Sequence, residues 1–365
     1  MPKNVRLGIV GLGNRGRDLL KIASSAFEGV EAVALCEKNQ GLLSSAREEF
    51  PKAESFNDFD TMLKKVKLDA LMIETPATLH AEFASKALLK GINVISDIPC
   101  VYNLDDAWSL WKAQERSKAF YMTGANPNFW AFVETAVDLK RKGLLGSPYY
   151  IDAEYIHDIR KLFGKTPWRA SFESIRYCTH SLGPMLRLID EDFEWASCFD
   201  TGSHINKKDG QHDVMVALFR TRSNVVMRLT TSFINNYPWA GHHYRLFTTT
   251  GAFERTTGYG KDCPERTLFC SSELYGCKGW TELPSDLARP EHAVEAINSG
   301  HGGADYAMLN SFFKAVRSGG PSPISLRDGL RMTLPGIYAA ASARKGGHLE
   351  RIEYPWTTKR PPSSR

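Results

Sequence analysis

The sequence lacks several features that mark whole classes of protein. No apolar run approaches the roughly 18 residues that a membrane-spanning helix needs, and the N-terminal residues show no apolar signal region with a small-residue cleavage site. No run of five or more basic residues is present, and Lys plus Arg (46) barely exceed Asp plus Glu (41). We therefore expect no membrane segment, no nucleic-acid partner, and a cytoplasmic protein.

Cysteine usage gives no sign of a disulfide framework or a metal site. The seven cysteines are an odd number spread over a long chain, and no C-x-x-C pair is present. The last three are Cys263, Cys270 and Cys277, and no histidine lies among them at the spacing of metal ligands. We expect reduced thiols and no bound metal.

The length and hydrophobic pattern predict an N-terminal α/β domain. The 365 residues are 42% apolar and 24% charged, enough for two domains with cores. Up to about residue 123, short aliphatic runs alternate with segments of helical length, which predicts a doubly wound parallel sheet of the Rossmann type. The expected strands are 5–10, 30–36, 70–73, 93–96 and 120–122, and the expected helices are 18–25, 42–50, 80–89 and 104–118.

The pattern changes in the second part of the chain, where strands dominate. Alternating apolar and polar side chains predict an α+β domain with a large, mostly antiparallel sheet. Its expected strands are 149–157, 193–200, 213–220, 225–233 and 244–250; its expected helices are 131–142, 306–317 and 328–343. Residues 251–289 are rich in Gly, Pro and Ser and are expected to be mostly loop. The predicted domains are thus 1–123, which binds a nucleotide, and 124–365, which binds substrate.

The strongest single motif follows the first predicted strand. Residues 11–16 read Gly-Leu-Gly-Asn-Arg-Gly, which fits G-x-G-x-x-G at the start of a helix. Such glycines permit a tight turn and the close approach of a pyrophosphate, and the helix N-terminus offers N–H donors. We expect Gly11, Gly13, Asn14, Arg15 and Gly16 to bind a dinucleotide; the alternative is a glycine-rich turn without a cofactor.

A carboxylate at the end of the second predicted strand supports the dinucleotide. Glu37 lies where an acidic residue accepts hydrogen bonds from the hydroxyls of the adenosine ribose. Because this carboxylate repels a 2′-phosphate, NAD is favoured over NADP, although the adjacent Lys38 keeps NADP as the alternative.

Two later loops belong to the same predicted site. Thr75 and His80 follow the strand 70–73, at the edge where doubly wound sheets bind ligands. We expect both to lie over the dinucleotide, with a capping role as the alternative for His80. Asp97, Ile98 and Pro99 follow the next strand, on the side expected for the nicotinamide.

Two pairs of tyrosine and histidine suggest a reaction site in the second domain. Strand periodicity puts Tyr155 and His157 on one face, and Tyr177 and His180 follow some twenty residues later at the start of a predicted helix. A phenol beside an imidazole can relay a proton, and a cationic nicotinamide favours the phenolate. The alternative is that the tyrosines pack in the core while the histidines bond to buried carbonyl groups.

The chain resembles the Gfo/Idh/MocA oxidoreductase family over nearly its whole length. The resemblance rests on the predicted Rossmann half, the stretch from Thr75 to His80, the strand that leads to Pro99, and the strand-rich second half. That family usually carries Glu-Lys-Pro where this chain has Asp97-Ile98-Pro99, and its lysine helps deprotonate a sugar or polyol hydroxyl during hydride transfer. Ile98 has no such capacity. The resemblance implies either that the activity is lost or that another group takes the proton.

Four motifs in register resemble one subgroup of that family, the NAD-dependent N-acetylgalactosaminidases of glycoside hydrolase family 109. They are Tyr-x-His-Asp, Trp-Arg, Tyr-Pro-Thr-His-x-x-Gly-Pro and Gly-His-Gly-Gly-x-Asp-Tyr. The corresponding residues here are 155–158, 168–169, 177–184 and 300–306, with Cys178 in place of the proline. That subgroup also has an aliphatic residue in place of the lysine. The resemblance assigns active-site roles to Tyr155, His157, Tyr177 and His180.

The resemblance implies a redox-neutral cycle on a small carbohydrate or glycoside, with a tightly held NAD. A sugar is oxidised at carbon 3, the aglycone is eliminated from carbon 1, water adds back, and the retained cofactor reduces the ketone. Such chemistry needs no carboxylate pair of the ordinary glycosidase kind. Asp152, Glu154 and Asp158 are candidates for such a pair only by their proximity in sequence.

Other residues are assigned less sharply. Arg169 is expected to hold the cofactor or a sugar hydroxyl, with a surface ion pair as the alternative. The subgroup has Glu-Asn where this chain reads Ala125-Asn126. We expect Asn126 to lie at the nicotinamide. Because the glutamate is missing, the identity of the sugar stays open. For His301 and Asp305, a loop near the cleft and a helix cap are equal alternatives.

Two rival functions remain open. One is a plain sugar or polyol dehydrogenase that releases NADH, and the other is a non-catalytic homologue that binds NAD and sugar. The resemblance further implies a homodimer or homotetramer formed through the C-terminal sheet. We expect Phe219, Val226 and Leu229 on its exposed face.

Overall fold

The computed structural model describes residues 4–359 except 206, 208–211, 237–240, 259–261 and 285–298. The described residues form two compact units. The first comprises those within Met1–Asn126, Glu291–Leu330 and Pro355–Arg365, and the second those within Pro127–Pro290 and Arg331–Tyr354. The chain therefore returns to the first unit near its end, which a single boundary after residue 123 does not describe.

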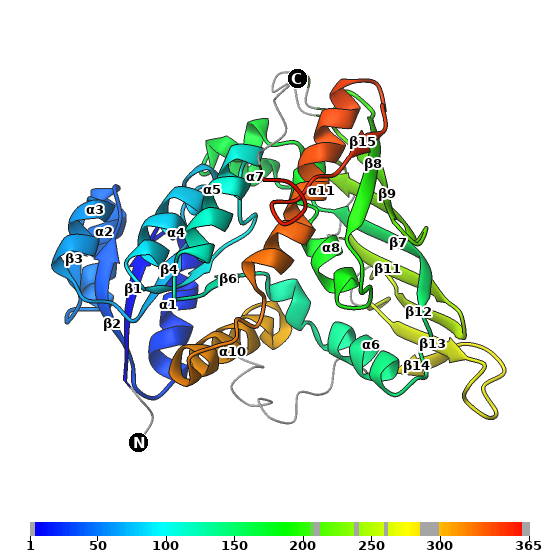
Figure 1. Ribbon diagram of the computed structural model, residues 1–365, viewed down its shortest axis with the longest axis horizontal. Helices are drawn as coiled ribbons and strands as arrows, with labels where there is room; N and C mark the ends of the chain where they lie inside the picture. Colours follow the sequence, from blue (N-terminus) through cyan, green and yellow to red (C-terminus); the bar gives the residue numbers. More distant parts are fainter. Residues whose placement is uncertain are drawn as a thin grey trace. The chain divides into compact units, whose positions relative to one another are not determined.

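The first unit is built on a six-stranded parallel sheet, as the sequence predicts (Figure 1). The strand order is β3-β2-β1-β4-β5-β6, so the direction of winding reverses between β1 and β4, where such folds bind ligands. The strands are β1 (Val5–Val10), β2 (Val30–Cys36), β3 (Glu54–Phe56), β4 (Ala70–Ile73), β5 (Asn93–Ser96) and β6 (Tyr121–Thr123). The helices are α1 (Asn14–Ala26), α2 (Gln40–Glu49), α3 (Phe59–Lys65), α4 (His80–Leu89) and α5 (Leu104–Glu115).

Local sequence explains where these elements begin. All four residues of β4 are buried aliphatic or Met side chains, as a strand covered on both faces requires. Asn39, Asp58 and Asn103 accept the N–H groups that open α2, α3 and α5. The sequence pattern missed β3 and α3, because a three-residue strand and a seven-residue helix are too short for a clear periodicity.

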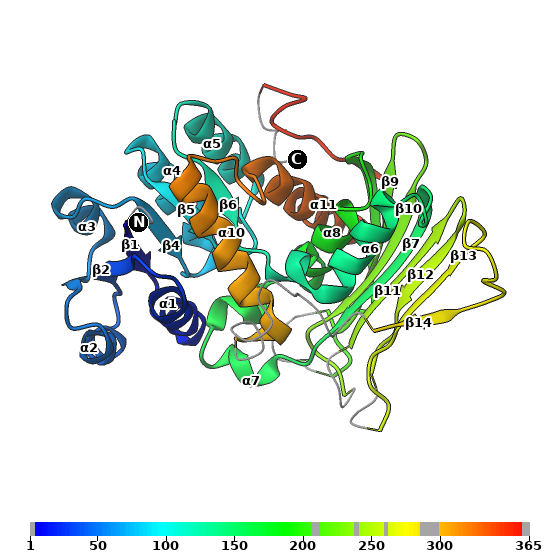
Figure 2. The same ribbon diagram turned by 90° about the horizontal axis from the view of Figure 1, so that it is seen from below.

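A late segment of the chain completes the first unit. The single turn η6 (His301–Gly303) leads into α10 (Ala304–Ser318), which contacts α1 and β1 (Figure 2). Phe27 after α1 stacks on Tyr306 of α10, with ring centroids 4.9 Å apart. Met122 of β6 bridges to Ser325. These contacts bring the predicted 300–306 motif to the nucleotide-binding fold rather than to the second sheet.

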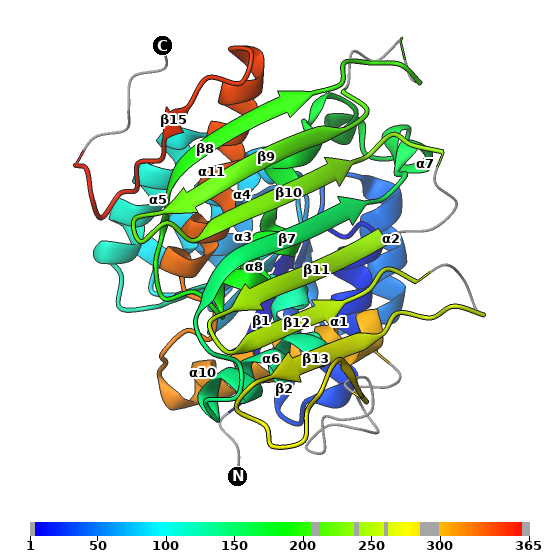
Figure 3. The same cartoon turned by 90° about the vertical axis from the view of Figure 1, so that its right-hand side faces the viewer.

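The second unit contains a nine-stranded sheet in the order β14-β13-β12-β11-β7-β10-β9-β8-β15 (Figure 3). Its pairings are antiparallel except for β7 with β10. The strands are β7 (Pro148–Ile156), β8 (Phe193–Asp200), β9 (Met215–Thr221), β10 (Val226–Ser232), β11 (Gly241–Thr248), β12 (Gly251–Arg255), β13 (Thr267–Ser271), β14 (Thr281–Leu283) and β15 (Glu350–Arg351).

The second unit also contains helices. They include α6 (Ala131–Arg141), α7 (Arg160–Phe163), α8 (Thr179–Leu186) and the part of α11 (Leu326–Arg344) after Leu330. Helix α6 ends before Gly143, whose φ of +75° suits a glycine after a helix, as expected. Helix α8 packs on β7.

The sequence pattern missed β12, β13 and β14, which lie within residues 251–289, because glycine-rich turns separate short strands in which buried and less buried residues alternate, as in β13. One expectation about the exposed face of the sheet is wrong. Phe219 and Leu229 do not face solvent, since both are 0% exposed; their neighbour Leu218, one residue out of phase with Phe219, is 51% exposed.

Candidate active site

The glycine-rich loop has the geometry of a dinucleotide cradle. Gly11 has a φ of +94°, and a Cβ on Gly16 would lie 2.1 Å from the Gly11 carbonyl oxygen, so both positions require glycine. A Cβ on Gly13 would meet nothing within 4 Å, so the backbone there faces open space. Helix α1 begins at Asn14 without a side-chain cap, which leaves its first N–H groups for a ligand.

Glu37 is fixed beside this loop. Its Oε2 accepts the Leu12 N–H at 2.8 Å and its Oε1 accepts the Asn39 N–H at 2.9 Å. An ionised carboxylate has further lone pairs, which can accept from ribose hydroxyls. Open space over Gly13, free helical N–H groups and this carboxylate together fit a dinucleotide.

The predicted loops at β4 and β5 are tied to each other. The ring of His80 is 1% exposed; its Nδ1 lies 2.8 Å from the Pro99 oxygen and its Nε2 lies 2.8 Å from the Thr75 oxygen. His80 therefore ties the loop after β4 to the loop after β5. Ile98 is 3% exposed and has no group that could take a proton.

The buried carboxylate of Asp305 contacts side chains from three segments of the first unit that lie far apart in the sequence. Asp305 accepts from Arg15 Nη1 at 2.7 Å and Nη2 at 2.8 Å, and from Asn126 Nδ2 at 3.0 Å. Nδ1 of His301 lies 2.9 Å from the same carboxylate. The structure thus brings the predicted Arg15 and Asn126 together, and the side chain of Asp305 does not cap its own helix.

The pKa values of two carboxyl groups near this loop, Asp305 and Glu74, are shifted in opposite directions. Burial works to raise the pKa of Asp305, but hydrogen bonds from His301 and Arg15 outweigh it and hold that pKa below the ordinary value. Burial and the nearby Asp97 raise the pKa of Glu74, whose side chain lies under the same loop. Asp305 is therefore ionised at neutral pH.

The predicted tyrosines and histidines of the second unit do converge. Tyr155 on β7 is 5% exposed, and its ring centroid lies 5.6 Å from that of Tyr177 and 5.1 Å from that of His180. The rings of Tyr177 and His180 stack at 4.7 Å. Tyr155 Oη lies 3.3 Å from His157 Nδ1, at the long end of a hydrogen bond.

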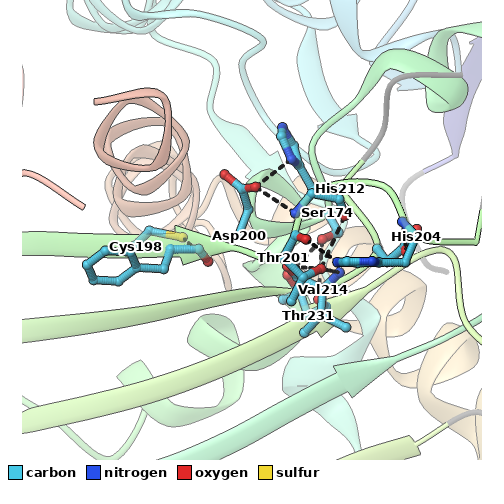
Figure 4. Close-up of polar contacts among 11 residues, drawn as sticks. Ser174, Cys198, Asp200, Thr201, His204, His212, Val214 and Thr231 are labelled. Carbon is cyan, nitrogen blue, oxygen red and sulfur yellow. Dashed lines mark hydrogen bonds and ion pairs between the residues drawn. The ribbon is translucent and has the colours of Figure 1, made fainter. Parts of the chain in front are cut away.

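Polar contacts at Ser174 and Thr231 and around Asp200 and Thr201 lie in the second unit (Figure 4). Ser174 opens the turn η4 (Ser174–Tyr177), and its Oγ lies 2.9 Å from Oγ1 of Thr231, the residue paired with Tyr155 across β10 and β7. Farther along, His212 Nδ1 lies 2.7 Å from Asp200 Oδ1 and His204 Nε2 lies 2.6 Å from the Thr201 oxygen. Asp200 also accepts the Gly202 N–H, so it supports the loop after β8.

His242 joins the cluster and was missed by the sequence reasoning. It pairs with Tyr155 across β11 and β7, and the two ring centroids lie 4.9 Å apart. Its ring is also 5.1 Å from Trp130 and 6.2 Å from His180. The register of β11 against β7 places His242 beside Tyr155, and a single sequence does not supply that register.

Burial sets the protonation of this cluster. Burial, together with Tyr177, raises the pKa of Tyr155 well above its usual value, so its phenol is protonated at neutral pH. Burial also lowers the pKa of His157 below 6.5, which leaves a neutral imidazole. The proton acceptor of this pair is therefore the imidazole rather than the phenolate.

Arg169 lies in the second unit, within the turn η3 (Pro167–Ser171). Its Cζ lies 4.6 Å from the ring centroid of Trp168 and 5.5 Å from that of Tyr177. A cation within about 6 Å of an aromatic face is attracted to it. The structure thus places Arg169 with the Tyr/His cluster.

Comparison with known proteins identifies the nucleotide-binding fold. Residues 5–125 match the model of an oxidoreductase family with an NAD-binding Rossmann fold. The matched family is the Gfo/Idh/MocA oxidoreductase family. The resemblance drawn from its motifs is confirmed.

Relatives extend the similarity over nearly the whole chain. A glycosyl hydrolase family 109 protein of Solibacter usitatus is 25% identical over 98% of this chain and 90% of its own length. One from Saccharopolyspora erythraea is 24% identical over 94% of this chain and 81% of its own length. These similarities support the subgroup read from the four motifs.

Solved structures share the fold. Levoglucosan dehydrogenase in complex with NADH and L-sorbose superposes with a TM-score of 0.82 at 18% identity, covering 96% of this chain and 100% of its own. Scyllo-inositol dehydrogenase from Lactobacillus casei, with NAD(H) and scyllo-inositol, gives 0.77 at 16% identity, covering 96% and 99%.

The described residues show neither a metal-binding cluster nor a membrane-spanning helix. Over the described part of the chain, no cluster of three or more His, Cys, Asp or Glu side chains has the arrangement of a metal site. Among the same residues, no helix has both the length and the apolar character needed to span a bilayer.

Proposed function

We propose that this chain is an NAD-dependent enzyme that cleaves a glycoside through a redox-neutral cycle. The observation that carries the proposal is the cluster of Tyr155, His157, Tyr177, His180 and His242 in a chain whose residues 5–125 match an NAD-binding oxidoreductase family. The cluster supplies groups that can transfer a proton, which the aliphatic side chain of Ile98 cannot do. The glycosyl hydrolase family 109 relatives support the same reaction class.

The first unit holds the cofactor in this proposal. The N–H groups of Gly13, Asn14 and the start of α1 bind the pyrophosphate, and Glu37 binds the adenosine ribose, which favours NAD over NADP. Thr75 and Asn126 lie along the remainder of the dinucleotide. Bound NAD would supply the hydride acceptor for oxidation at carbon 3 of the sugar and the hydride donor for its reduction.

The second unit moves the protons. Neutral His157 accepts, through Tyr155, the proton of the carbon-3 hydroxyl while the hydride leaves that carbon. The resulting ketone acidifies the hydrogen on carbon 2, which the Tyr177–His180 pair removes. The electron pair forms the C1–C2 double bond, and the aglycone leaves carbon 1 with a proton.

Water then adds across that double bond, its oxygen to carbon 1 and a proton to carbon 2. Return of the hydride and a proton to the ketone restores the carbon-3 hydroxyl, so the net reaction is hydrolysis. Arg169, whose guanidinium lies against Tyr177, holds an oxygen of the sugar in this scheme. A tightly retained cofactor follows from the cycle, because the same hydride must be given back.

The second candidate is a plain sugar or polyol dehydrogenase. It is favoured by the fold shared with levoglucosan dehydrogenase and scyllo-inositol dehydrogenase. The two candidates differ in whether NADH accumulates and whether the aglycone is released.

One spectrum separates them. The purified protein is mixed with a panel of nitrophenyl glycosides, and the nitrophenolate and NADH bands are followed together. Nitrophenolate release without net NADH supports the redox-neutral cycle. NADH formed in step with substrate, without nitrophenolate, replaces it with the dehydrogenase, and silence in both bands across the panel favours a non-catalytic binding protein.

A further inference from the structure

Asp305 lies at the centre of a hydrogen-bond hub in the first unit. Its carboxylate is 3% exposed and accepts a bidentate pair from Arg15, one bond from the Asn126 amide and one from His301. These partners come from the glycine-rich loop, from the residues after β6, and from the turn before α10. The segments are separated by up to 290 positions in the sequence.

An ionised carboxylate only accepts hydrogen bonds, so it fixes the polarity of each partner. Asn126 must turn its NH₂ group toward Asp305, which leaves Oδ1 as an acceptor. His301 must carry its proton on Nδ1. The guanidinium of Arg15 is held in one plane, with N–H groups beyond the two donated to Asp305.

The backbone around His301 supports a specific placement. His301 has a φ of +57°, which is uncommon for a non-glycine residue, and Gly302 and Gly303 follow at +61° and +88°. Such a conformation persists only where its surroundings impose it. The stacking of Phe27 on Tyr306 fixes the start of α10 against the end of α1, close in sequence to this turn.

We infer that Asp305 is a positioning residue of the cofactor site: it fixes Arg15 toward the diphosphate and Asn126 toward the nicotinamide end of the bound dinucleotide. This inference rests on the proposed binding of NAD. Asp305 touches neither the cofactor nor the substrate; it acts through Arg15 and Asn126. The competing explanation is that Asp305 only fastens α10 to the rest of the unit.

The test is NAD affinity, measured by isothermal titration calorimetry on the full chain freed of nucleotide. Asp305→Asn keeps the shape but removes the charge and one acceptor, so we expect the Kd for NAD to rise about 10- to 100-fold. The matched control is Asp328→Asn. Asp328 also lies in the first turn of a helix, but it accepts from Ser325 of its own segment, and its replacement is expected to leave the Kd unchanged.

A double-mutant cycle separates positioning from fastening. If Asp305 acts in part through Arg15, Arg15→Gln alone weakens NAD binding, and Asp305→Asn raises the Kd at least threefold less in the Arg15→Gln background than in the wild-type background. If Asp305 only fastens α10, the Asp305→Asn variant has a lower melting temperature, but its Kd for NAD stays within threefold of the wild-type value. That result overturns the inference. If Asp305→Asn does not fold, Arg15→Gln decides alone, because wild-type affinity in that variant overturns the inference.

The two proposals fail differently. No NAD binding by the wild-type chain refutes the proposed function. Wild-type binding with an unaffected Asp305→Asn refutes only the positioning role.

Discussion

Replacing Gly13 with alanine separates cofactor binding from folding. Gly13 precedes α1 with φ −62° and ψ 178°, a conformation that alanine adopts without strain. Its added methyl group would meet no protein atom within 4 Å. The folded protein therefore tolerates the change, and the lower entropy of the unfolded chain even favours it.

The same methyl group projects into the space proposed for the pyrophosphate. Hydrogen bonds from N–H groups to phosphate oxygens span about 2.7–3.2 Å, and a methyl group at this point keeps the phosphate at a greater distance. A hydrogen bond to a charged group contributes about 1.5–3 kcal/mol, so the loss of one weakens binding about 10- to 150-fold.

The assay combines calorimetric titration with NAD and a thermal melt of the nucleotide-free protein. We expect the Kd of Gly13→Ala to rise by this factor while its melting temperature does not fall. Gly279→Ala, where a Cβ also meets nothing within 4 Å, is the control and is expected to keep wild-type affinity. Wild-type affinity in Gly13→Ala would refute the placement of the pyrophosphate.

Three further predictions concern the second unit. Because burial lowers the pKa of His157 and the proposed mechanism needs its neutral form, the acid limb of kcat against pH lies below 6.5; a limb above 6.5 contradicts this role. His242→Phe keeps the ring beside Tyr155 but removes both nitrogens, and we expect kcat/KM to fall about 10- to 100-fold with an unchanged melting temperature, whereas wild-type kcat/KM would exclude His242 from the site. We further propose that the outer face of the nine-stranded sheet joins copies of the chain, so Leu218→Glu, at a side chain 51% exposed, is expected to reduce the mass measured by light scattering to that of a monomer; a monomeric wild type ends this proposal.

The sequence was most informative where local chemistry is strict. The turn at Gly11 and the tight contact at Gly16 admit only glycine, so the motif predicted the first β-α unit and the tight turn that joins its strand to its helix. Strand periodicity likewise placed Tyr155 and His157 side by side at the end of β7. These features depend on residues close together in sequence.

Long-range packing could not be predicted in the same way. The register of β11 against β7, which brings His242 to Tyr155, depends on pairing between strands about ninety positions apart. The return of α10 to the first unit is equally non-local, so a boundary after residue 123 looked sufficient. The error at Phe219 has a local origin, because a sequence of alternating side chains does not state which face is covered.

The redox-neutral cycle is tested most directly by the fate of two hydrogens on the sugar. The first nitrophenyl glycoside that the enzyme cleaves is turned over in D₂O, and the released sugar is examined by NMR. The account predicts deuterium at carbon 2, where a proton leaves and is replaced from solvent, and hydrogen retained at carbon 3, where the same hydride returns. A released sugar without deuterium at carbon 2 would contradict the account, because direct hydrolysis never breaks that bond.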